Sequence, residues 1–146
     1  WLPRVRESRS GEARRVSIWS AACCTGEEPF SLAIMLRETA PELADWRVTI
    51  LATDINTEYL GRAARGEYGE WSFRGVAEHL RWRYFEPRGR GRYALSPDIR
   101  RMVTFTSVNL ADAAEVENVV HPGVMDLILC DRNVQRHITV RMWSSS

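Results

Sequence analysis

The sequence predicts an α/β fold in which helices cover a parallel β-sheet. The first observation is that residues 16–65 alternate between strand-like and helix-like segments. The second is a nearly unbroken apolar and β-branched run at 48–54, which is typical of a strand buried on both faces. The third is that the alternation resumes at 102–130, after an aromatic-rich interval. Strands separated by helices in this way pair in parallel through right-handed crossovers.

The first expected unit is a strand, a tight turn and a helix. Val16 to Trp19 is β-branched and aromatic, and small residues and Gly26 follow it. Apolar residues then recur at helical spacing, which predicts a helix that opens at Pro29 and stops before Pro41. A strand that passes into a helix through small residues leaves helix N–H groups facing an open crevice, where open α/β sheets bind ligands. We therefore expect the functional site at this turn.

The rest of the sheet is predicted by similar patterns. Asn56 and Thr57 can cap a helix that Gly66 ends. The sheet is expected to be incomplete, because a doubly wound fold normally has more strands than the sequence offers. The further expected elements are strands at 48–54, 102–108 and 125–130, and helices at 58–65 and 112–120.

The middle of the chain departs from the alternation. Aromatic residues concentrate between Trp71 and Phe85, in a segment expected to be helical from about Gly75 onward. Residues 87–92 then indicate a turn before Tyr93, Ala94 and Leu95. We interpret residues 67–100, approximately, as a small α+β insertion packed by its own aromatic side chains.

Length and composition describe one ordinary globular domain. The 146 residues carry a formal net charge of +1, which gives no electrostatic reason to expect nucleic acid as a partner. No apolar stretch approaches the ~20 residues of a membrane span, and no signal peptide opens the chain, so a cytoplasmic protein is expected. The domain is predicted over 16–130, between a linker or helix end at 1–15 and a divergent tail at 131–146.

The three cysteines do not predict a metal site or a disulfide. Cys23 and Cys24 are adjacent and Cys130 is remote, so the chain has no Cys-x-x-Cys spacing. Adjacent cysteines are poor joint ligands for a tetrahedral metal and rarely pair with each other. We expect all three to be small buried side chains at strand ends, and no metal to be bound.

Polar groups follow three of the predicted strands and should meet at the carboxyl edge of the sheet. They are the loop from Ala21 to Glu28, the carboxylate of Asp54, and the pair Asn109 and Leu110. A carboxylate at the end of the second strand suits the two hydroxyls of a ribose, because it can accept a hydrogen bond from each. The pattern therefore indicates a cofactor that contains a nucleoside.

The first loop distinguishes between such cofactors. A pyrophosphate is normally held by a Gly-x-Gly-x-x-Gly turn, whereas this loop has Gly26 alone, followed by Glu27 and Glu28. Two carboxylates would repel a diphosphate and attract a cationic head group. S-adenosylmethionine combines an amino group, a sulfonium and a ribose, so it is the expected cofactor, and a dinucleotide-dependent oxidoreductase is disfavoured.

These motifs resemble, in order and in spacing, those of the CheR-type chemoreceptor glutamate methyltransferases. The first is long and specific, whereas the others would be weak alone. The segments that carry the resemblance are Trp19-Ser-Ala-Ala-Cys-Cys-Thr-Gly-Glu-Glu-Pro-Phe-Ser31, Ala52-Thr-Asp-Ile-Asn56, Ser107-Val-Asn-Leu110, and Asp126-Leu-Ile-Leu-Cys130 followed by Arg132-Asn133.

The resemblance implies a Rossmann-like class I methyltransferase domain that binds S-adenosylmethionine and esterifies glutamate side chains of receptor-like proteins. It places Glu28 at the methionine part of the cofactor, Asp54 at the ribose, and Asn109 with Leu110 beside the adenine. It also implies that the insertion is the small β-subdomain that docks the receptor in some members. No catalytic residue is assigned. The candidate cofactor-binding residues are Ala21, Ala22, Thr25, Gly26, Glu28, Asp54, Ile55, Asn109, Leu110, Arg132 and Asn133.

The chain also departs from the family pattern at both ends. The family carries an Asn-x-Thr-x-Phe-Phe-Arg block ahead of the first strand, before the position of Trp1. After Cys130 the family reads Arg-Asn-Val-x-x-Tyr-Phe, whereas here Asp131 is inserted and His137 takes the tyrosine position. We therefore expect a copy that is truncated or frame-shifted relative to the family. The alternative to an active methyltransferase is a module that binds S-adenosylmethionine without turnover.

Overall fold

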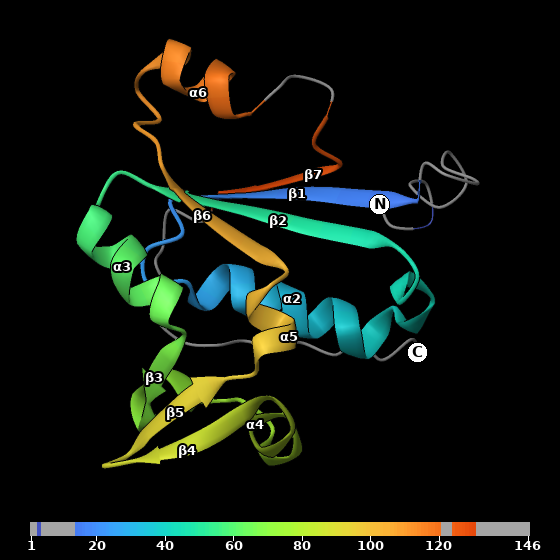
Figure 1. Ribbon diagram of the computed structural model, residues 1–146, viewed down its shortest axis with the longest axis vertical. Helices are drawn as coiled ribbons and strands as arrows, with labels where there is room; N and C mark the ends of the chain where they lie inside the picture. The colour runs from blue at the N-terminus through green and yellow to red at the C-terminus, as the bar shows by residue number, and fades with distance from the viewer. Residues whose placement is uncertain (1–2, 4–13, 121–123, 131–146) are drawn as a thin grey trace.

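The computed structural model describes residues 3, 14–120 and 124–130, and within them the predicted fold class is confirmed. A parallel four-stranded sheet has the order β6-β2-β1-β7 (Figure 1). The apolar run of the sequence forms a central strand, as its burial on both faces requires. The strands are β1 (Arg15–Ala21), β2 (Arg47–Asp54), β6 (Val103–Ser107) and β7 (Leu127–Cys130).

Helices cover both faces of this sheet. On one face lie α2 (Glu27–Thr39), α3 (Thr57–Arg65) and α5 (Pro97–Arg100), and on the other lies α6 (Ala113–Val119) (Figure 1). The larger core joins the sheet to α2, and each large side chain buried in it contributes about 1.5–3 kcal/mol to stability. A smaller core under α6 contains Trp19, Ala21 and Val120. Fully buried members of the larger core include Val16, Ile18, Phe30, Ile34 and Ile50.

The ends of α3 and α6 follow from capping residues that the sequence supplies. The Asn56 side chain accepts hydrogen bonds from the N–H groups of Glu58 and Tyr59, and Gly66 closes α3 in the left-handed conformation. The predicted cap and stop are thus confirmed. Asp112 caps α6 in the same way, so both helices begin directly after a strand and its short loop.

A second, antiparallel sheet lies between α3 and α5 in the sequence and below the parallel sheet in Figure 1. Its aromatic side chains form edge-on contacts, of which the closest joins Phe73 and Phe85 with ring centroids 4.8 Å apart. Such contacts add to the area that the rings bury. The sheet has the order β3-β5-β4, with strands β3 (Glu67–Gly69), β4 (Phe85–Gly89) and β5 (Arg92–Leu95), and it packs with the helices η3 (Glu70–Phe73) and α4 (Glu78–Tyr84).

Several boundaries differ from the sequence predictions. The helix expected from about Gly75 begins at Glu78, and Phe85 leaves it to pair with Leu95 as the first residue of β4. Cross-strand pairing overrides the local helical pattern there. Strand β3 and the 3-10 helix η2 (Pro41–Leu43) were not predicted. Helix α2 starts at Glu27, two residues before Pro29, because Gly26 is its N-cap.

The structure describes the two ends of the chain only in part. Arg15 is the first residue of β1, one position before the predicted start of the domain at Val16. The tail predicted at 131–146 lies outside the described residues. Among the helices that the structure describes, none combines the length and apolar character needed to cross a membrane.

Candidate cofactor site

The three predicted strand ends meet at one edge of the sheet. Parallel register places Ala21 beside Thr53 on one side and beside Cys130 on the other. Asp54 in turn lies beside Ser107, two residues before Asn109. The structure therefore brings together the loop after β1, the carboxylate after β2 and the turn after β6, as parallel pairing requires.

Asp54 is a buried carboxylate at this edge, with 8% of its surface exposed. One carboxylate oxygen accepts the N–H of Cys24 at 2.9 Å, and the other accepts the N–H of Asn56 at 2.9 Å. The carboxylate thus ties the loop after β1 to the turn before α3. An ionised carboxylate has about four acceptor positions, so each oxygen retains capacity for a further donor such as a ribose hydroxyl.

The loop after β1 follows an unusual backbone path. Ala22 and Cys24 have φ values of 58° and 50°, and Gly26 has a φ of 90°. Such left-handed residues are held only when surrounding contacts fix them, and they are frequent at binding loops. Two contacts do this: the Cys23 N–H donates to the Thr53 carbonyl at 2.9 Å, and the Gly26 N–H donates to the Cys23 carbonyl at 3.0 Å.

Gly26 is packed between two elements that come later in the chain. A Cβ at this position would lie 2.9 Å from the Ala63 Cβ of α3 and 3.0 Å from the Tyr68 hydroxyl of β3. The Tyr68 hydroxyl donates to the Thr25 carbonyl at 2.9 Å. Packing within the protein, together with the positive φ, is therefore sufficient to explain why glycine occupies this position. Sequence reasoning missed Tyr68, which carries no signal beyond its place after Gly66.

The two glutamates of the first turn of α2 have different surroundings. Glu27 is buried, and the Thr25 hydroxyl donates to its carboxylate at 2.6 Å. Glu28 is half-buried, and the hydroxyl of Ser20 in β1 donates to its carboxylate at 2.5 Å. The helix dipole stabilises both negative charges at this end. Glu28 gives the crevice a negative end, which fits a cationic group and opposes a diphosphate.

An apolar surface lies beside Asp54. Ile55 follows β2 and Leu110 follows the neighbouring β6, and their side chains are 64% and 42% exposed. The Asn109 N–H donates to the Glu115 carboxylate at 2.7 Å, and its side chain accepts the Ala111 N–H at 3.0 Å. The turn is therefore fixed while the two apolar side chains stay uncovered, which fits the flat ring of an adenine.

The cysteines agree only in part with their prediction. Cys23 is buried, and burial together with the charge of Asp54 raises the pKa of its thiol to about 12. Cys24 is half-buried and Cys130 is exposed, so the expectation of three buried cysteines is wrong for these two. Within the described ranges, no group of three or more His, Cys, Asp or Glu side chains could hold a metal ion. Arg132, Asn133 and His137 lie outside the described residues.

Comparison with known proteins identifies this arrangement. The family model described as "CheR methyltransferase, SAM binding domain" matches residues 2–144. The chain belongs to this CheR family. The description names S-adenosylmethionine (SAM) as the ligand of the domain, so the cofactor predicted from the acidic turn and from Asp54 is confirmed at the level of the family.

Several relatives of this CheR domain are named chemotaxis protein methyltransferases. Chemotaxis protein methyltransferase 2 of Vibrio cholerae is 40% identical over 129 residues, which are 88% of this chain and 43% of the relative. Chemotaxis protein methyltransferase 1 of Pseudomonas aeruginosa is 36% identical over 137 residues, 91% of this chain and 47% of the relative. The chain thus spans about half the length of the curated relatives it matches.

Proposed function

We propose that the chain is the cofactor-binding part of an S-adenosylmethionine-dependent protein-glutamate O-methyltransferase of the chemotaxis type. The observation that carries this proposal is the position of Asp54, a buried carboxylate at the end of β2 that holds the loop leading to the acidic first turn of α2. We extend the proposal to the domain bounds, 16–130 with an insertion at about 67–100. We place the activity in the cytoplasm, as the sequence predicts.

Each candidate residue has a proposed role that its surroundings support. Asp54 accepts the ribose hydroxyls, and Glu28 faces the amino group of the methionine part, with Ser20 orienting its carboxylate. Ile55 and Leu110 cover the adenine, and Asn109 fixes the turn that presents Leu110. Ala21, Ala22, Thr25 and Gly26 form the wall of the crevice. Arg132 and Asn133 lie outside the described residues, and the family resemblance alone supports their proposed role in cofactor binding.

The reaction requires mainly positioning from the protein. The bound cofactor supplies a methyl group that its sulfonium already activates. The residues of the chain hold that cofactor in one orientation and keep water from it, and a receptor glutamate carboxylate placed in line completes the arrangement. Receptor glutamates are proposed as the acceptors because the named relatives are chemotaxis protein methyltransferases.

Calorimetric titration with S-adenosylhomocysteine tests the cofactor site. We expect Asp54→Ala to weaken binding by about 1–3 kcal/mol, because a charged hydrogen-bond acceptor is lost. Asp45→Ala, which removes an exposed carboxylate next to η2, is the control and should leave binding unchanged. Unchanged affinity in Asp54→Ala, or tighter binding of NADH than of S-adenosylhomocysteine, would contradict the proposal.

A further inference from the structure

A hollow of about 260 Å³ opens beside the loop after β1. We call this loop, residues 22–26, the cofactor loop. The hollow lies on the side of the antiparallel sheet of β3, β5 and β4, which we call the small sheet. Thr25 and Glu27 form one wall of it, and α3, β3 and β5 form the others. Its charged lining consists of three arginines, Arg62 and Arg65 from α3 and Arg92 from β5, and two glutamates, Glu27 and Glu67. We call this hollow the arginine groove. The groove and the proposed cofactor site involve consecutive residues of α2, because Glu27 lines the groove and Glu28 is assigned to the cofactor site.

The arginines of the groove are weakly engaged within the chain. Arg62 pairs with Glu58 at 2.7 Å, and both side chains are more than half exposed. Arg92 lies 3.9 Å from the Glu67 carboxylate, again with exposed side chains. Among the described residues, Arg65 forms no ion pair. Exposed pairs contribute about 0–1 kcal/mol each, so carboxylates from a partner can replace them at little cost.

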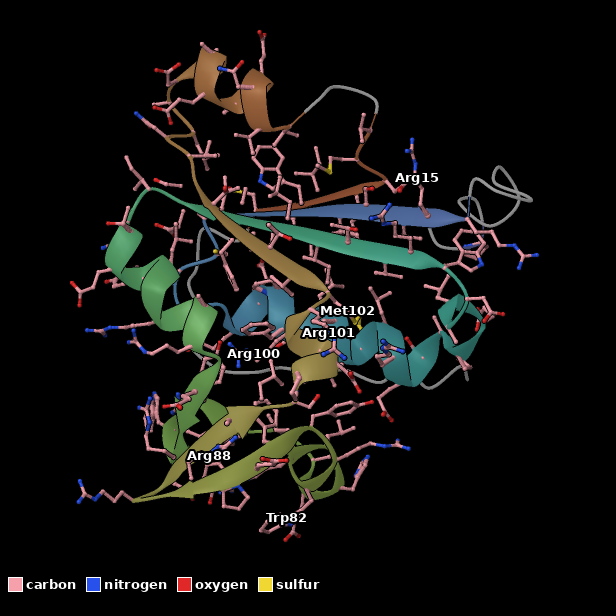
Figure 2. The ribbon with its side chains drawn as sticks, in the orientation of Figure 1. Arg15, Trp82, Arg88, Arg100, Arg101 and Met102 are labelled. Atoms are coloured by element: carbon pink, nitrogen blue, oxygen red, sulfur yellow. The ribbon has the colours of Figure 1, made fainter. Side chains whose placement is uncertain are left out.

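The charge distribution of the chain favours an anionic partner on this side. Residues 57–101 contain ten arginines and six Asp or Glu, whereas residues 107–130 contain four Asp or Glu and no arginine. Figure 2 shows Arg88, Arg100 and Arg101 on the elements below the parallel sheet, the same half that carries the groove. A positive field of this kind steers an acidic segment toward the groove during encounter.

We propose that the arginine groove binds a carboxylate-rich segment of the methyl-accepting protein, adjacent to the glutamate that is modified. The proposal rests on the proposed function and adds to it the place where the acceptor polypeptide lies. Arg65 and Arg92 pair with carboxylates that flank the acceptor glutamate. A guanidinium suits this role because its planar donors match a carboxylate in a bidentate pair.

The chemistry of the transfer gives the groove a further property. A carboxylate oxygen forms the new C–O bond, and the S–C bond breaks with its electron pair staying on sulfur. The acceptor carboxylate thereby becomes a neutral ester, which no longer forms an ion pair with arginine. The groove therefore favours segments whose neighbouring glutamates are still unmodified, and affinity falls as modification proceeds.

Fluorescence anisotropy with a labelled peptide rich in glutamate tests the groove. The wild-type chain should bind this peptide at low salt and should bind a counterpart with glutamine in place of glutamate more weakly. We expect the double variant Arg65→Gln, Arg92→Gln to weaken binding of the glutamate peptide by about three- to tenfold. The single variants should each account for part of this loss.

The matched control is the double variant Arg37→Gln, Arg47→Gln. It removes the same charge, and Arg37, like Arg65, lies in the last turn of a helix. Arg37 is near the end of α2 and Arg47 is the first residue of β2, so both are remote from the loop after β1. Equal weakening in both double variants, equal binding of the two peptides, or no peptide binding at all would overturn the proposal. Affinity for S-adenosylhomocysteine should stay unchanged in the groove variant, so failure of the groove is distinguishable from failure of the cofactor site.

Discussion

The hydroxyl of Tyr68 donates a hydrogen bond of 2.9 Å to the carbonyl of Thr25. Tyr68 belongs to β3 of the small sheet, and Thr25 belongs to the loop that follows the first strand of the parallel sheet. The Tyr68 ring is buried and makes edge-on contacts with Phe30 of α2 and Phe85 of β4. A single side chain thus links the cofactor loop, the helix after it and the small sheet.

Removing this hydroxyl should loosen the cofactor loop. Tyr68→Phe keeps the ring contacts but leaves the half-buried Thr25 carbonyl without this donor, so we expect a loss of about 1–2 kcal/mol in the free energy of unfolding. Affinity for S-adenosylhomocysteine should fall about three- to tenfold as the loop loses its fixed conformation. Tyr93→Phe removes a hydroxyl that donates to the exposed Glu70, and it is the control for affinity. Equal affinity in the two variants would contradict a positioning role of Tyr68.

Two glycines allow a direct test of packing at the loop. Gly26→Ala places a methyl group 2.9 Å from the Ala63 Cβ in a residue whose φ is 90°, so we expect it to destabilise the fold by more than about 2 kcal/mol. Gly61→Ala adds a methyl group within α3, where nothing lies within 4 Å, and should stabilise the fold by up to about 1 kcal/mol. Urea denaturation compares the two variants. Similar effects of the same sign would contradict the packing at Gly26.

The buried thiol of Cys23 should make stability depend on alkaline pH. Burial raises the pKa of this thiol from its usual 9.0 to about 12, so the fold favours the protonated form. The contribution is complete below pH 9 and is lost as the pH rises toward 12. Between pH 8 and pH 10.5 we expect a loss on the order of 1–2 kcal/mol. Urea denaturation at both values measures it.

The variant Cys23→Ala isolates this effect. It leaves a small cavity whose cost does not depend on pH, whereas it abolishes the ionisation. Its stability should therefore fall less than that of the wild type between the two pH values. Cys130→Ala, which removes an exposed thiol, should keep the dependence of the wild type. An identical decline in Cys23→Ala would show that other groups cause it.

A polar contact joins the last turn of α4 to the last turn of α2. The Glu38 carboxylate accepts the Tyr84 hydroxyl at 2.5 Å and the Arg83 guanidinium at 2.9 Å. Burial, and after it the contact with Glu38, raises the pKa of Tyr84 to about 12. Glu38→Ala should lower this pKa toward 10, as followed by tyrosinate absorbance, and should destabilise the fold by about 1–2 kcal/mol. Glu117→Ala, at an exposed position of α6, should change neither quantity.

The elements predicted best from the sequence are those governed by local signals. The composition of the apolar run that ends at Asp54 was enough to predict a buried strand of a parallel sheet. Asn56 and Gly66 mark the ends of α3 because caps act within one turn of the helix. The place of Asp54 at the carboxyl edge of the sheet was predictable for a similar reason, since the end of a parallel strand fixes the edge to which its last residue belongs.

The features missed by sequence reasoning depend on distant contacts. Strand β3 has three residues, too few to show periodicity, and it exists because it pairs with β5 some 25 residues later. Phe85 looked helical beside its neighbours, yet its partner Leu95 draws it into a strand. Tyr68 could not be recognised as part of the loop environment, because its only link to Thr25 is a contact across 43 positions.

The packing of Gly26 against Ala63 and Tyr68 also has a consequence for the order of folding. The loop residues precede the residues that shape them by about 40 positions, and closing such a separation is slow compared with forming a helix. The helices can therefore form before the loop between β1 and α2 has taken its final conformation. Recovery of cofactor affinity during refolding should lag behind recovery of helical signal and coincide with docking of the small sheet.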